Sequence, residues 1–82
     1  GVNCLDYCHI ADKPYIVSGG DDCTVKVWDY QTKQCIYTFE SHEDDITSVA
    51  FHPELPIIFS CGEDGIVNIW NAQTYKLEQS LK

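Results

Sequence analysis

Apolar and polar residues alternate along short stretches of this chain, and turn-forming residues separate the stretches. In the second half these stretches are 46–51 (ITSVAF), 56–60 (PIIFS), 66–70 (IVNIW) and 76–81 (KLEQSL). Proline, glycine, aspartate and asparagine lie between them and favour turns. Convincing helical periodicity is not found in any segment. The pattern therefore predicts four short β-strands and an all-β structure.

The same pattern occurs once earlier in the chain. Residues 15–40 align with 57–82 without a gap, at a period of 42 residues. Upstream, 2–7 matches 46–51 at a spacing of 44, so the first copy has two extra residues. We expect these extra residues in a loop around 9–13, and we expect four strands in each copy.

A period of about 40 to 45 residues with four strands is typical of WD40 β-propeller blades. The chain resembles this family in Val27-Trp28-Asp29, Ile69-Trp70-Asn71, Ser41-His42 and Asp64-Gly65. It departs from the usual motif in Ser41, Cys23 and Asn71. The resemblance implies two four-stranded antiparallel blades, at 1–40 and 41–82, with the start of the first blade truncated.

Two blades cannot close a propeller, whose members usually have about seven. Each blade buries its flanks against neighbouring blades, and repeat arrays generally need at least about three units for stability. We therefore expect the chain to be a fragment of a longer protein, with marginal order when it is isolated.

The charge of the chain narrows the choice of partners. Thirteen acidic residues oppose five basic ones, all lysines, and the net charge is −8. Such a surface repels nucleic-acid phosphates and anionic lipid headgroups, and it favours a basic partner. The alternative is that the negative charge serves solubility alone.

Composition argues against several other classes of protein. No apolar run approaches the roughly 20 residues of a membrane-spanning helix, and a signal peptide is not indicated. Gly19-Gly20 ends a strand before an acidic turn and does not form a phosphate-binding loop. Neither metal nor cofactor is expected. The cysteines lack a C-x-x-C pair and are expected to be reduced thiols; they are Cys4, Cys8, Cys23, Cys35 and Cys61.

Ser60, His42 and Asp64 are the residue types of a hydrolytic triad. However, no nucleophile elbow or oxyanion hole is evident in the sequence. The WD40 resemblance instead implies a buried structural network of these three residues with Trp70, and no enzymatic activity. In the first copy the corresponding residues are Ser18, Asp22 and Trp28, and we expect the matching histidine before Gly1.

The resemblance also implies a binding face, where the first strand of each blade starts and where a residue precedes the turn aspartate. Clustered carboxylates there would hold a lysine ammonium through charge-assisted hydrogen bonds. We rank Asp21 first. The candidate residues are Asp21, Asp45, Glu63, Thr47 and Asn3.

Four stretches that general WD40 chemistry does not require resemble the β′-type coatomer family of the COPI vesicle coat. They are 12–15 (DKPY), 25–31 (VKVWDYQ), 51–58 (FHPELPII) and 74–78 (TYKLE). The resemblance implies two middle blades of an N-terminal propeller, in a cytoplasmic scaffold on Golgi and COPI vesicle membranes. Its implied partners are other coatomer subunits, the remaining blades, and dilysine-type tails of cargo returning from Golgi to endoplasmic reticulum.

Two other functions stay open. One is a WD40 interaction platform in another complex, for example a ubiquitin-ligase adaptor. Readers of phosphorylated degrons need arginines on the binding face, and this chain has none. The other is a purely structural pair of blades with no ligand contact.

Overall fold

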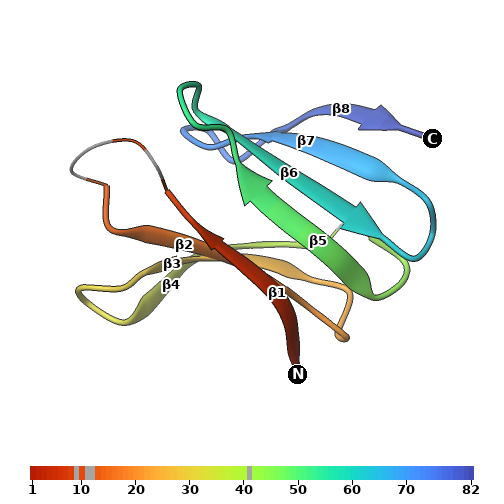
Figure 1. The fold of residues 1–82 in the computed structure, drawn as a ribbon, viewed down its shortest axis with the longest axis horizontal. Coiled ribbons are helices and arrows are strands. Elements are labelled where there is room, and N and C mark those ends of the chain that lie inside the picture. The colour runs from red at the N-terminus through yellow and green to blue at the C-terminus, as the bar shows by residue number, and fades with distance from the viewer. Residues whose placement is uncertain (9, 11–12, 41) are drawn as a thin grey trace.

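A computed structural model describes residues 1–8, 10, 13–40 and 42–82 of the chain. They form two four-stranded sheets that lie against each other (Figure 1). The expected loop around 9–13, the DKPY stretch and the Ser-His motif fall partly outside these residues. Among the described residues, none form a helix with the length and apolarity that membrane crossing requires.

Each sheet is antiparallel and its strands follow chain order. The prediction of an all-β structure with two four-stranded antiparallel sheets is confirmed. The first sheet consists of β1 (Val2–Tyr7), β2 (Tyr15–Gly20), β3 (Val25–Asp29) and β4 (Gln34–Phe39). The second consists of β5 (Ile46–Phe51), β6 (Ile57–Gly62), β7 (Val67–Asn71) and β8 (Leu77–Leu81).

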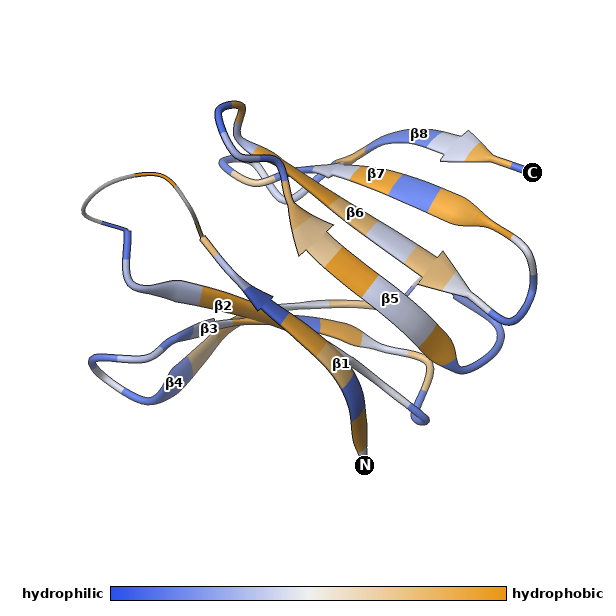
Figure 2. Cartoon of the chain, viewed as in Figure 1, coloured by the Kyte–Doolittle hydropathy of each residue, from blue (hydrophilic) through white to orange (hydrophobic). Residues whose placement is uncertain are grey.

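The strands lie close to their predicted positions. β5 has the bounds that the alternating pattern predicts, whereas β6 extends two residues beyond the predicted 56–60. The extension follows from pairing, because the start of β5 needs a partner and Ile46 pairs with Gly62. Hydrophobic and hydrophilic bands alternate along β5 and β7 (Figure 2).

The core lies between the two sheets, and β1 and β5 run next to each other across the junction (Figure 1). Hydrogen bonds connect these strands. Asn3 Nδ2 donates to the Ile46 carbonyl at 3.3 Å, and Phe51 N donates to Asp6 Oδ2 at 2.9 Å. The buried apolar side chains are Val17, Val25, Val27, Phe39, Ile46, Val49, Phe51, Ile58 and Trp70.

Aromatic rings also cross the junction between the sheets. Phe39 of β4 packs on Trp70 of β7, with ring centroids 4.2 Å apart. Tyr37 stacks on Tyr75, which lies in the β7–β8 turn, at 4.8 Å and nearly parallel. The last strand of the first sheet is therefore held against the second sheet by its side chains.

The β3–β4 and β7–β8 turns have the same construction. Asp29 Oδ1 accepts two backbone N–H groups of its turn, and Asn71 Oδ1 does the same in the second copy. An amide oxygen accepts these bonds as a carboxylate does, so the exchange of aspartate for asparagine leaves the turn intact. Lys33 and Tyr75 occupy equivalent left-handed positions, with φ of 63° and 60°.

Charges are distributed unequally between the two ends of the strands. We call the end with the β2–β3 and β6–β7 turns the acidic end, and the end with the β3–β4 and β7–β8 turns the opposite end. Three of the five lysines lie at the opposite end: Lys13, Lys33 and Lys76. Eight of the 13 acidic residues lie at the acidic end: Asp21, Asp22, Glu40, Glu43, Asp44, Asp45, Glu63 and Asp64.

Candidate functional site

A buried set of polar side chains joins β6, β7 and the segment before β5. Trp70 Nε1 donates to Ser60 Oγ at 2.9 Å, and Ser60 Oγ lies 2.8 Å from His42 Nε2. All three residues are buried. Since Ser60 pairs with Asn68 in the sheet, its hydroxyl points to the same side as the Trp70 ring two residues along.

On its other side the imidazole meets an acid. His42 Nδ1 lies 3.4 Å from Asp64 Oδ2. A carboxylate only accepts, so the consistent assignment has Nδ1–H donating to Asp64 and the Ser60 hydroxyl donating to Nε2. Asp64 Oδ1 also accepts the Ile66 N–H at 3.0 Å. This backbone bond is the main cause of the lowered pKa of Asp64, with further contributions from Glu43 N–H and His42.

Serine, histidine and aspartate are thus linked in the order of a hydrolytic triad, but Ser60 has 0% of its surface exposed. Its oxygen accepts the Trp70 N–H and faces the imidazole inside the sheet. A nucleophile must reach a substrate atom, and this hydroxyl cannot. The arrangement satisfies buried polar groups instead of activating one.

Two residues that hydrogen-bond to this set or to each other, Asn68 and Ser80, were not predicted. Asn68 Nδ2 lies 3.3 Å from His42 Nε2, and Asn68 Oδ1 accepts the Ser80 hydroxyl at 2.7 Å. Asn68 is buried on β7 between two apolar residues. The signal for it was the two-residue period, which places Asn68 on the same side of β7 as Trp70.

The network also depends on one close approach of the backbone. A Cβ atom added at Gly62 would lie 2.8 Å from Asp64 Oδ1 and 3.0 Å from His42 Nδ1. Both atoms belong to the network, so a side chain at this position would push the histidine and the aspartate apart.

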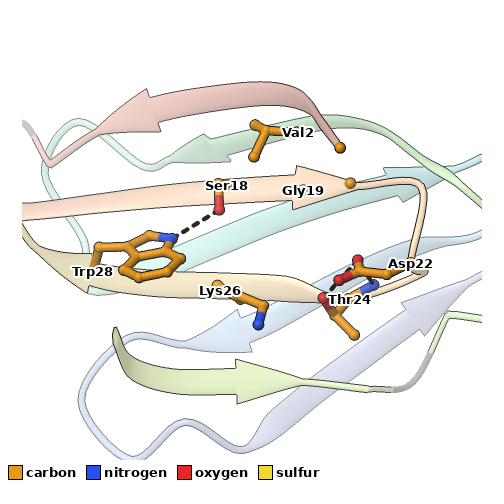
Figure 3. A pocket seen from close by; sticks show the side chains of 9 residues that line it. Val2, Ser18, Gly19, Asp22, Thr24, Lys26 and Trp28 are labelled. Carbon is orange, nitrogen blue, oxygen red and sulfur yellow. Dashed lines mark hydrogen bonds between the residues drawn. The ribbon is translucent and has the colours of Figure 1, made fainter. Parts of the chain in front are cut away.

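The first sheet repeats part of this arrangement (Figure 3). Trp28 Nε1 donates to Ser18 Oγ at 2.9 Å, as Trp70 does to Ser60. Asp22 is exposed among the described residues, which do not include the histidine expected to complete its network. Its carboxylate accepts the Thr24 hydroxyl at 2.8 Å and the Thr24 N–H at 3.1 Å, and these two bonds are the main causes of its lowered pKa.

A cavity of about 170 Å³ lies beside the Ser18–Trp28 pair (Figure 3). Its walls include the counterparts of the residues around His42 in the second sheet. Lys26 stands where Asn68 stands in the second copy, and its side chain lines the cavity. The described residues of the first sheet therefore hold the Trp–Ser pair without an imidazole beside it.

The candidate binding residues gather at the acidic end. The side chain of Asp21 is 56% exposed, so a ligand can reach its carboxylate. The Asp45 carbonyl accepts the Glu63 N–H at 2.9 Å, which places these two residues side by side. Glu63 is exposed and Asp45 is half-buried.

Asn3 and Thr47 contribute less to this surface. Both are exposed, but Asn3 donates to the Ile46 carbonyl and the Thr47 hydroxyl donates to the Cys61 carbonyl at 3.2 Å. Each hydroxyl or amide retains further hydrogen-bonding capacity toward a ligand.

Cys23 shows that the two turns belong to one surface. Burial raises the pKa of its thiol, and the nearby carboxylates of Asp45, Asp44, Asp22 and Asp64 raise it further. These acids come from both sheets, so the first-sheet turn and the segment before β5 share one negative field. The five cysteines carry free thiols. Among the described residues, no three acidic, histidine or cysteine side chains are arranged to hold a metal ion.

Comparison with known proteins identifies the same motifs. The family model for "WD domain, G-beta repeat" matches residues 1–29 and 33–71. Coatomer subunit beta'-1 of Arabidopsis thaliana is 59% identical over 56 residues, which cover 68% of this chain and 6% of that protein. Coatomer subunit beta' of Drosophila melanogaster is 57% identical over 81 residues, 99% of this chain and 9% of that protein.

Proteins with other names are similar as well. The crystal structure of the RRP9 WD40 repeats superposes with a TM-score of 0.88 at 28% identity, covering 98% of this chain and 24% of that one. Pre-mRNA-processing factor 19 of Mus musculus is 40% identical over 60 residues, 73% of this chain and 12% of that protein. The chain spans a small part of the length of each of these relatives.

Proposed function

Because this chain belongs to the WD40-repeat family, we propose that residues 1–40 and 41–82 are two blades of a propeller in the COPI vesicle coat. The identity to coatomer β′ subunits, 46% in Schizosaccharomyces pombe to 59% in Arabidopsis thaliana, supports this assignment. The protein acts as a non-catalytic scaffold. Its partners are the other coatomer subunits, and it works in the cytoplasm on Golgi and vesicle membranes.

The second part of the proposal is that the acidic end binds lysine-based signals at the C-termini of membrane cargo. The observation that carries it is the joining of carboxylates from both sheets on one surface, with Asp21, Asp45 and Glu63 exposed or half-exposed. A lysine ammonium donates three hydrogen bonds and is strongly attracted to such a field. Recognition of this signal would serve retrieval from Golgi to endoplasmic reticulum.

Asp21 is the first contact in this proposal. Its side chain is 56% exposed, and its carboxylate lies outside the buried network of His42, Ser60 and Trp70. The negative charges of Asp45 and Glu63, which belong to the second sheet, attract the same lysine. The terminal carboxylate of a cargo tail needs basic groups, which we place on other blades because this chain has no arginine.

The test is a titration of the full-length protein with a cargo-tail peptide that ends in a dilysine signal. Asp21→Ala should weaken binding by about tenfold, because a charge-assisted contact is lost. Replacing both peptide lysines by serine should abolish binding. Glu54→Ala, which removes an exposed carboxylate at the opposite end, is the matched control and should leave affinity unchanged.

Equal affinity of the wild type and Asp21→Ala would remove this blade from the binding site and leave a structural role. Equal weakening by Asp21→Ala and Glu54→Ala would show that net charge, and not a contact, determines the affinity. Amide exchange of both variants must match the wild type, so that a folding defect is distinguished from a lost contact.

A second function is a WD40 interaction platform in another complex. The likeness to pre-mRNA-processing factor 19 favours keeping it as a candidate. A pull-down of the full-length protein from cytosol distinguishes these two functions. A coat protein should co-purify with coatomer subunits, whereas the platform of another complex should not.

A further inference from the structure

Three turns at the opposite end share one hydrogen-bonding pattern. In the β3–β4 and β7–β8 turns, a side-chain oxygen of Asp29 or Asn71 accepts the backbone N–H groups two and three residues further along the chain. In the β5–β6 turn the acceptor is the imidazole of His52. Its Nδ1 accepts the Glu54 N–H at 3.0 Å and the Leu55 N–H at 2.9 Å. A ring nitrogen therefore does here what a side-chain oxygen does in the other two turns.

These two bonds determine the protonation state of His52 in the ordered turn. Backbone N–H groups only donate, so Nδ1 is the unprotonated nitrogen and the ring hydrogen is assigned to Nε2. The flipped ring would place a carbon where the two donors point. A second proton on the imidazole has to bind at Nδ1, because only that nitrogen has a free lone pair. The proton and the two N–H groups therefore compete for the same lone pair.

The turn that His52 organises is connected to other parts of the molecule. The His52 N–H donates to the Ile57 carbonyl at 2.9 Å, and the Ile57 N–H donates to the Leu55 carbonyl at 2.8 Å. The Pro56 carbonyl accepts the Ala72 N–H at 2.7 Å, which ties the β5–β6 turn to the β7–β8 turn. Leu55 and Pro56 also line a groove between the two sheets. The order of this turn thus determines where two groove-lining side chains lie.

Several titratable groups surround the turn. The imidazole packs on the uncharged ring of Phe59 in β6, with centroids 6.3 Å apart. Among the described residues, the charged groups that share a groove, a hollow or a hydrogen bond with residues 51–56 are Glu54 itself, Lys13, Glu78 and Asp6. Cys8, Tyr15 and Tyr75 line the same groove. The carboxylates attract a proton to this region and Lys13 repels it. The two N–H donors decide the outcome at Nδ1, because they contact the nitrogen that the proton needs.

We propose that His52 makes the β5–β6 turn sensitive to pH: the turn is ordered while the imidazole is neutral, and it opens when Nδ1 takes up a proton. Histidine is the side chain that changes its charge between about pH 8 and about pH 5. The stabilising contribution of the two bonds is therefore present at the alkaline end of this range and is lost as the pH falls. Opening releases Leu55 and Pro56, so the surface of the opposite end changes. The proposal uses only this turn and does not depend on the coat assignment.

Millisecond hydrogen exchange of the full-length protein, followed by mass spectrometry, measures the order of the turn at about pH 7.5 and at about pH 5.5. After correction for the intrinsic dependence of exchange on pH, protection of the Glu54 and Leu55 N–H groups should fall about tenfold in acid, because both bonds are lost. The Gln73 and Thr74 N–H groups are the internal reference. They should keep their protection, since the side-chain amide of Asn71 does not titrate.

His52→Asn is the matched variant, because an amide oxygen accepts the equivalent N–H groups in the Asn71 turn. It should keep the protection of Glu54 and Leu55 within about threefold of the wild type at about pH 7.5, and it should remove the pH dependence. His52→Ala lacks an acceptor and should show low protection at both pH values. Unchanged protection of the wild type in acid would overturn the proposal. So would the same acid response in His52→Asn, which would assign the response to another group, such as His42.

Discussion

The two sheets share strand order, turn construction and a Trp–Ser hydrogen bond of 2.9 Å, yet they differ beside that bond. In the second sheet the imidazole of His42 joins Ser60 to Asp64. In the first sheet a cavity of about 170 Å³ lies beside Ser18 and Trp28. Among the described residues, the Trp–Ser bond is common to both sheets, and the imidazole contact is seen in the second sheet.

The polar contacts of these sheets are of two kinds: those within one hairpin, and those between segments that are distant in the sequence. The Trp–Ser bond joins two neighbouring strands, and each turn acid binds a backbone N–H two residues further on, at Thr24 and at Ile66. Both features need only a hairpin. His42 comes from outside the hairpin, so its bonds tie the segment before β5 to β6 and β7.

The largest expected effect comes from removing the shared hydroxyl. Ser60→Ala should lower the local free energy of unfolding of the second sheet by about 1–3 kcal/mol, because a buried indole N–H and a buried imidazole lose a partner. Ser18→Ala should also weaken the first sheet, because the Trp28 indole N–H loses its acceptor. Amide exchange of β6 and β2, followed by mass spectrometry in the full-length protein, measures both.

The comparison would be broken if Ser60→Ala left the protection of β6 unchanged. That result would mean that the hydrogen bonds of Ser60 to Trp70 and His42 do not stabilise the second sheet. Ser60→Thr keeps a hydroxyl and serves as the control, because it should retain the part of the free energy of unfolding that the Ser60 hydroxyl contributes.

Acid should weaken the hydrogen bonds that the turn aspartates Asp22 and Asp64 accept. The pKa values of Asp22 and Asp64 are both lowered from 3.8 in the folded protein. Their stabilising contributions are therefore present above the unfolded pKa and are lost as the pH falls through the folded pKa. In the second sheet the loss should extend to residues 42–45, because Asp64 accepts hydrogen bonds from His42 and from the Glu43 N–H.

Amide exchange between about pH 5 and about pH 2, corrected for the intrinsic dependence of exchange on pH, follows this loss. Asp64→Asn keeps an oxygen acceptor without the titrating group, so it should flatten the acid response of residues 42–45. An unchanged acid response in Asp64→Asn would assign the transition to other carboxylates.

The smallest expected effect concerns the paired turn positions Cys23 and Gly65. Both have left-handed backbone, with φ of 68° and 78°, and the space around a Cβ at Gly65 is open within 4 Å. Gly65→Ala should therefore destabilise its turn by about 1 kcal/mol through backbone conformation alone. Cys23→Gly should stabilise its turn by up to about 1 kcal/mol. Slower amide exchange of Thr24 in Cys23→Gly, together with faster amide exchange of Ile66 in Gly65→Ala, would show that the left-handed backbone causes both effects.

Much of the fold could be predicted from the sequence, because alternation and turn residues are local signals. All eight strands lie at or within a few residues of the predicted stretches. β6 extends further than predicted because pairing with β5 determines where it ends. Strand ends depend on partners that the local pattern does not contain.

The site was less predictable, for the same reason. Asn68 joins the network through a histidine 26 residues away, which no local pattern reveals. Asp64 is half-buried because His42 and the Glu43 backbone cover it, and both come from outside its hairpin.

The most direct test of the proposed function is a crystal structure of the full-length protein, or of its complete propeller, with a dilysine cargo-tail peptide bound. The account predicts a lysine ammonium within hydrogen-bond distance of the Asp21 carboxylate, with Asp45 and Glu63 facing it across the acidic end. A peptide bound on other blades with Asp21 in solvent would contradict the account.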